Sequence, residues 1–147
     1  MLLLALVSTL LGSMLSAGQA SAQTQATALR PADIDRVTAV PANGRVTCYG
    51  YTGTFKAGTN VIVVNWESTS DECFGIATDR TIWHAWPNSN GWHRMPGGGY
   101  ADSIAYLLFL EDPALEFRRI VVYTVSSDKF WCQEYFSPSW DGYWFEC

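Results

Sequence analysis

Six side chains near the middle of the chain have types and a spacing suited to binding a sugar. They are Asp79, Trp86, Asn88, Asn90, Trp92 and Arg94. Flat aromatic rings pack against the C–H faces of a sugar, while Asp, Asn and Arg side chains hydrogen-bond its hydroxyl groups. Trp86 and Trp92 flank a turn cluster at 87–91 that contains both asparagines. The cluster predicts a ligand-binding site, and the alternative is that the two tryptophans brace a hairpin across its strands.

Two histidines in the same segment could serve a metal site or a hydrolase. His84 and His93 face each other if a hairpin turns midway between them. With Asp79 or Asp102 they could hold a metal, and with Asp79, Asp102 or Ser103 they could act in a small hydrolase. However, the sequence has no G-x-S-x-G or H-E-x-x-H motif. We expect an ordinary cross-strand pair, no cofactor, no metal and no enzymatic activity, and keep a hydrolase using His84 and His93 as an alternative.

The chain has four cysteines, and an even number in an exported protein predicts disulfides. No C-x-x-C spacing is present, which disfavours a metal site. A hairpin turning near 138–141 sets Cys132 opposite Cys147, because each lies about equally far from the turn. The remaining pair is Cys48 with Cys73.

The first 22 residues have the pattern of a signal peptide. Residues 2–15 are almost all apolar, and the small residues Ala20, Ser21 and Ala22 follow. The alternative is a membrane anchor, but the apolar run is shorter than the roughly 20 residues that a membrane span needs. We expect cleavage after Ala22, a secreted, extracellular protein and no membrane span once the signal is removed.

The charge of the chain argues against a nucleic-acid partner. The formal net charge is −5, and phosphate binding needs clustered Lys and Arg. The basic pair Arg118 and Arg119 stands inside an apolar run, and we expect it at edge or solvent-facing strand positions. The acidic pairs at 71–72 and 111–112 are expected to be solvated loop charges.

The remaining pattern predicts a mainly β protein. Residues 23–43 have no sustained period and predict a flexible leader with a short turn of helix at 31–37. From residue 44 to 147 the pattern favours one disulfide-bonded domain, a small antiparallel β-sheet or sandwich or a blade-like unit. Strands are expected at 46–51, 61–66, 73–78, 81–86, 92–95, 119–125, 129–135 and 143–147. Residues 103–110 fit either a buried strand or a short helix.

Two segments repeat the same order of features. In each, an Asp and a basic residue precede a Trp-bearing strand, and another Trp follows nine positions later. The tryptophan pairs are Trp83 with Trp92 and Trp131 with Trp140, so the second unit follows the first by 48 positions. A period near 50 with several short strands per unit is typical of a propeller blade.

The first unit also resembles a known family. Residues 79–86 (DRTIWHAW), followed by 91–92 (GW) and 97–98 (GG), look like one blade of the fucose-binding lectin-like β-propellers. The second unit resembles it more loosely, with Trp131-Cys132 in place of Trp-His. The resemblance implies a sugar bound between blades, with Trp stacked on its ring.

We therefore expect a small secreted binding protein whose partner is an extracellular glycan. The alternative is a secreted inhibitor or protein-interaction module, in which an exposed loop such as 67–72 or 96–100 would insert into a protein partner.

Overall fold

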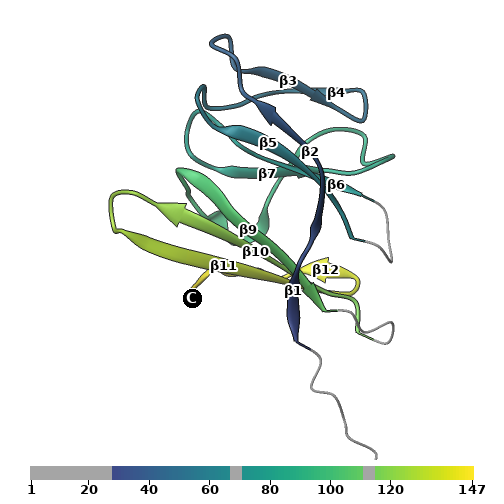
Figure 1. Ribbon diagram of the computed structural model, residues 1–147. Helices are drawn as coiled ribbons and strands as arrows, with labels where there is room; N and C mark the ends of the chain where they lie inside the picture. The colour runs from purple at the N-terminus through teal and green to yellow at the C-terminus, as the bar shows by residue number, and fades with distance from the viewer. Residues whose placement is uncertain (1–27, 67–70, 111–114) are drawn as a thin grey trace, which may run out of the picture.

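The computed structural model of the chain describes residues 28–66, 71–110 and 115–147. The predicted signal peptide, residues 23–27 and the segments 67–70 and 111–114 lie outside the described residues. Within them the chain forms two antiparallel sheets and a separate hairpin (Figure 1). The prediction of a mainly β, antiparallel fold with two disulfides is confirmed.

Sheet 1 has the strand order β2-β5-β6-β7-β8, and sheet 2 has the order β1-β9-β10-β11-β12 with β13 also paired to β11. The strands of sheet 1 are β2 (Asp33–Ala39), β5 (Asn60–Asn65), β6 (Glu72–Ile76), β7 (Ile82–Ala85) and β8 (His93–Arg94). Those of sheet 2 are β1 (Leu29–Pro31), β9 (Ser103–Leu110), β10 (Phe117–Thr124), β11 (Lys129–Phe136), β12 (Ser139–Trp140) and β13 (Phe145–Glu146). The hairpin consists of β3 (Arg45–Cys48) and β4 (Tyr51–Thr54), and a short 3-10 helix, η1 (Pro96–Gly98), lies between β8 and β9.

The three units stack in layers with sheet 1 in the middle (Figure 1). One apolar cluster fills the space between the sheets and includes Phe74 of β6 and Ile120 of β10. The other lies between sheet 1 and the hairpin and includes Val46 of β3 and Cys73 of β6. Because β6 is covered on both faces, all five of its residues are buried and its sequence shows no polar alternation.

A tightly fitted phenylalanine explains two glycines in this layer. Phe55, which follows β4, is buried, and its ring lies against Gly53 and Gly75. A Cβ atom at either glycine would stand 2.6 Å from a ring carbon of Phe55. Glycine at these two positions therefore lets the hairpin approach sheet 1 closely.

Both predicted disulfides are present. Cys48 bonds Cys73, which fastens the hairpin to β6, and Cys132 bonds Cys147 near the C-terminus. The register is not the predicted one, because Cys132 lies opposite Phe145 and the loop 141–144 separates β12 from β13. Cys147 lies just past the end of β13, within reach of β11.

The prediction of a flexible leader at 23–43 with a helical turn at 31–37 is wrong for residues 29–39. Leu29–Pro31 pairs with β9 in sheet 2, and Asp33–Ala39 pairs with β5 in sheet 1. The side chains of β2 are mostly exposed, so this edge strand depends on backbone hydrogen bonds rather than on a buried face. For that reason its sequence lacks the alternation by which strands are recognised.

Two other segments were ambiguous or misjudged from the pattern. The expected strand at 46–51 is instead the end of β3, a two-residue turn and the start of β4, since Tyr49 and Gly50 both have positive φ. The ambiguous run at 103–110 is the strand β9, paired with β1 on one side and with β10 on the other.

The two echoing units each contribute three consecutive antiparallel strands. The first forms β6, β7 and β8 in sheet 1, and the second forms β10, β11 and β12 in sheet 2. The resemblance to lectin-like propeller blades stays a prediction.

Candidate functional site

A cavity of about 630 Å³ opens between the two sheets, and we call it the inter-sheet pocket. Its volume lies in the range of roughly 300–1,000 Å³ that is typical of small-molecule sites. It is lined by Glu72, His84, Trp86, Pro96, Glu116, Arg118, Tyr135, Pro138, Ser139 and Trp140. Strands β6 and β7 supply one wall, and β10, β11 and β12 supply the other.

A buried carboxylate organises the pocket. Glu72, the first residue of β6, is 3% exposed. Its Oε1 accepts hydrogen bonds from His84 Nδ1 at 2.5 Å and Trp140 Nε1 at 3.2 Å. Its Oε2 accepts from Trp66 Nε1 at 3.0 Å and Arg118 at 3.3 Å. One carboxylate from sheet 1 thus holds side chains from both sheets in place.

The positive charge beside Glu72 is equally enclosed. Arg118 of β10 is 8% exposed and also donates to Glu116 Oε1. Its guanidinium carbon lies 4.4 Å from the ring centre of Tyr135 and 5.2 Å from that of Trp66. These distances are those of cation–π contacts, so both carboxylates and two aromatic rings fix the position of this side chain.

Aromatic rings form the sides of the pocket. Trp140 meets Tyr135 edge-on with ring centres 5.6 Å apart, and it meets His84 edge-on at 6.4 Å. The ring centre of Trp86, the residue after β7, lies 5.0 Å from that of His84. The pocket therefore offers flat apolar surfaces beside charged groups, which suits a ligand with both C–H and hydroxyl faces.

The two histidines are a cross-strand pair, as expected. His84 and His93 are register partners in β7 and β8, with ring centres 6.4 Å apart. His93 bonds the carbonyl oxygen of Ser89 through Nε2, whereas His84 bonds Glu72. Among the described residues, no group of three or more His, Cys, Asp and Glu side chains is arranged to hold a metal ion.

The structure does not bring the two predicted tryptophans together. Trp86 lines the inter-sheet pocket and stacks on His93 at 5.1 Å. Trp92 packs edge-on against Phe55 at 4.5 Å, and its Nε1 donates to the carbonyl oxygen of Tyr51. Trp92 belongs to a different cavity, between the hairpin and sheet 1.

The other four predicted residues have roles in local structure. Asn88 and Asn90 have positive φ, a conformation that Asn tolerates in turns, and their side chains are exposed. Asp79 accepts hydrogen bonds from the hydroxyl and the backbone N–H of Thr81, which lowers the pKa of Asp79. Arg94 lies 5.9 Å from the ring centre of Tyr100. These four residues do not line the inter-sheet pocket.

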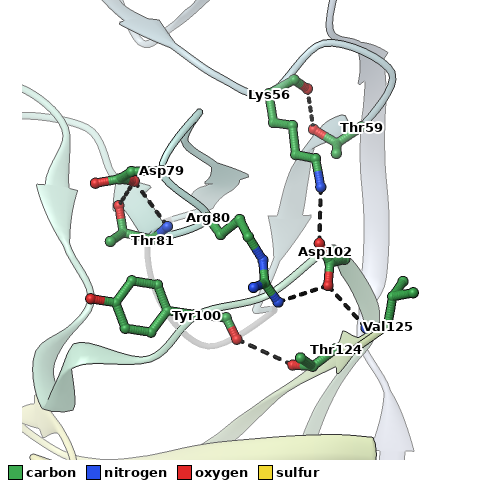
Figure 2. A network of polar contacts seen from close by, with 9 residues as sticks. All are labelled: Lys56, Thr59, Asp79, Arg80, Thr81, Tyr100, Asp102, Thr124 and Val125. Carbon is green, nitrogen blue, oxygen red and sulfur yellow. Dashed lines mark hydrogen bonds and ion pairs between the residues drawn. The ribbon is translucent and has the colours of Figure 1, made fainter. Parts of the chain in front are cut away.

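Asp102, considered above as a partner for the histidines, belongs to a separate network (Figure 2). Its carboxylate accepts from Lys56 Nζ at 2.9 Å, Arg80 at 2.8 Å and the backbone N–H of Val125 at 2.9 Å. The hydrogen bond from Lys56, together with the others, lowers the pKa of Asp102 to about 2. The network joins the turn after β6 in sheet 1 to the turn after β10 in sheet 2.

Two organising residues were misjudged from the sequence. Glu72 was expected to be a solvated loop charge and Arg118 an edge or solvent-facing residue, and both are wrong because these side chains pair between the sheets. A signal for Arg118 exists, since it has the same strand parity as the buried residues Ile120 and Val122. The sequence has no such signal for Glu72, because it begins a strand buried on both faces.

Comparison with protein-family models, with curated proteins and with solved structures finds no match to this chain. Within the ranges described above, no helix has the length and hydropathy needed to cross a bilayer.

Proposed function

We propose that this chain is a secreted, non-enzymatic binding protein that holds a sugar in the inter-sheet pocket. The observation that carries the proposal is that one cavity combines aromatic rings with polar side chains held in place by Glu72. Trp86, Tyr135 and Trp140 supply the rings. Glu72 holds Trp140 in place through a hydrogen bond. The resemblance of the Trp-bearing segments to lectin-like blades agrees with this function without locating the site.

The chemistry of sugars fits this combination. A sugar ring has apolar C–H faces and a polar rim of hydroxyl groups. When one face packs on an indole and the hydroxyl groups hydrogen-bond to charged side chains, these bonds replace those to water and the free-energy cost of desolvation is small. His84, Glu116 and Ser139 line the pocket and can exchange hydrogen bonds with such a rim. Two disulfides support export, because they form and persist in oxidising compartments.

The experiment is a glycan array followed by titration of intrinsic tryptophan fluorescence. We expect wild-type protein to bind and Trp86→Ala to lose binding while remaining folded by circular dichroism. Trp92→Ala is the matched control, because Trp92 is also partly buried but lies in the other cavity. Absence of glycan binding by the wild type, or equal binding by Trp86→Ala, contradicts the proposal.

A second candidate is a small hydrolase, which one contact favours. The bond from His84 Nδ1 to Glu72 orients the imidazole, as a carboxylate orients the histidine of a catalytic triad. Nε2 would then be the nitrogen that acts as general base. Ser139 lines the same pocket and is the candidate nucleophile. Labelling by a fluorophosphonate in the wild type but not in Ser139→Ala supports this function, and an unlabelled wild type removes it.

A further inference from the structure

We infer that the sugar bound in the inter-sheet pocket carries a positively charged amino group, and that Glu116 selects it. This inference rests on the proposed function and names its ligand class. Three charged carboxylate or guanidinium side chains of the described residues line the pocket: Glu72, Glu116 and Arg118. The charge of the preferred ligand depends on which of these three groups has a free hydrogen-bonding position and is exposed to the cavity.

Glu72 has no acceptor position to offer. A carboxylate has about four hydrogen-bonding positions, two on each oxygen. Both positions on Oε1 are taken by His84 and Trp140, and both on Oε2 by Trp66 and Arg118. Its side chain is only 4% exposed, so Glu72 acts as a positioning residue for the walls of the pocket.

Arg118 is not placed to recruit an anionic ligand. Its guanidinium donates to Glu72 and Glu116, and its faces contact Tyr135 and Trp66. The side chain is 10% exposed. A ligand carboxylate that approached this guanidinium would meet Glu72 and Glu116 at close range, which is unfavourable for like charges.

Glu116 is the charged group that faces a ligand. Its side chain is 26% exposed, more than those of Glu72 and Arg118. Its Oε1 is bonded to Arg118, and within the described part of the chain no hydrogen bond is found at Oε2. An ammonium group on the ligand would supply the donor that this oxygen can accept.

The aromatic rings favour the same charge. Cations are attracted to the faces of indole and phenol rings, and Trp86 and Trp140 line the same pocket as Glu116. Among the carboxylate and guanidinium groups of the described lining, two are negative and one is positive. An amino sugar joins a flat C–H face to an ammonium group and meets both features.

Isothermal titration calorimetry with three oligosaccharides of equal length tests the inference. They are oligomers of glucosamine, of N-acetylglucosamine and of galacturonic acid, at low salt and at a mildly acidic pH that keeps the amines protonated. We expect the glucosamine oligomer to bind at least about five-fold more tightly than the acetylated one. A gain in affinity of this size is what a partly exposed ion pair contributes. The preference should shrink as salt is added.

Variants at two glutamates locate the effect. Glu116→Gln should remove the preference, and Glu116→Asp, which keeps the charge, should retain part of it. Glu134→Gln is the matched control, because Glu134 pairs with Arg119, the neighbour of Arg118, and does not line the pocket. Thermal unfolding of each variant checks that it is folded.

The outcomes separate the inference from the proposed function. Equal affinity for the glucosamine and N-acetylglucosamine oligomers, or a preference kept by Glu116→Gln, overturns the inference and leaves sugar binding in place. An array that identifies only neutral or acidic glycans overturns it as well. Absence of binding to every glycan overturns the proposed function itself.

Discussion

The indole Nε1 of Trp140 in sheet 2 donates a hydrogen bond to the carboxylate of Glu72 in sheet 1, across 68 positions of sequence. The same carboxylate accepts from Arg118 of sheet 2 and from His84 of its own sheet. One buried carboxylate therefore bonds side chains of both sheets at the pocket, in addition to the apolar cluster and the Asp102 network that also join them.

Replacing Glu72 by Ala is expected to destabilise the protein strongly. The change leaves Arg118 buried without one of its counter-charges and removes the acceptor of two indoles. We expect the free energy of unfolding to fall by about 3 kcal/mol or more, measured by urea denaturation. Glu134→Ala, which breaks a more exposed pair with Arg119, should cost about 1 kcal/mol or less. Similar losses in both variants contradict the role given to Glu72.

Asp102 should make the stability depend on acid pH. Its pKa is lowered from 3.8 to about 2 by the hydrogen bond from Lys56 and those from Val125 and Arg80. Its contribution is therefore fully present above the ordinary value and is lost as the pH falls toward about 2. Asp102→Asn should unfold at a lower temperature near neutral pH and show a shallower acid dependence in calorimetry. As a control, Asp35→Asn changes an exposed residue of β2 and should leave the dependence of the unfolding temperature on pH as in the wild type.

Gly75 should not tolerate a methyl group. A Cβ there would lie 2.6 Å from the ring of Phe55, and Gly53 blocks the ring from the other side. We expect Gly75→Ala to lose about 2 kcal/mol of unfolding free energy, as in overpacked cores. Gly142→Ala, where the space is open, should change it by no more than about 0.5 kcal/mol. Adding Phe55→Leu to Gly75→Ala should restore part of the loss, and strict additivity of the two changes contradicts the steric explanation.

The hydroxyl of Tyr49 should be dispensable for stability. Its oxygen is buried with no hydrogen-bond partner among the described residues, and burial raises the pKa of Tyr49 to about 12. Removing an unpaired buried hydroxyl costs nothing in hydrogen bonding, so Tyr49→Phe should match or exceed the wild type in urea. Tyr123→Phe loses a bond to Asp128 and should be no more stable than the wild type. A clear loss of stability in Tyr49→Phe would show that the hydroxyl has a partner.

Much of the fold could be predicted from local pattern. The strands β5, β10 and β11 are rich in β-branched and aromatic residues, and the spacing of the cysteines predicts the observed pairing although the register differs. The strand β2 could not be predicted, because an exposed edge strand has no buried face to impose alternation.

The site was harder to predict for a different reason. The aromatic spacing singled out Trp86, which lines the inter-sheet pocket, but joined it to Trp92, which lies in the cavity beside the hairpin. Only the packing of sheet on sheet brings Trp140 and Arg118 to Glu72, and the distances between them in sequence give no sign of it. Charged residues are rarely buried, so composition alone assigns Glu72 to solvent.

The division of the N-terminal strands between the sheets sets the order of assembly. β2 pairs with β5, which is near it in the sequence. β1 pairs with β9, so Leu29 can pair only when the chain extends to Leu110. All five strands of sheet 1 precede β9 in the chain, so the segment up to β8 contains the whole of sheet 1 but only β1 of sheet 2. The inter-sheet pocket, which needs both sheets, is therefore complete only when the chain extends to Trp140.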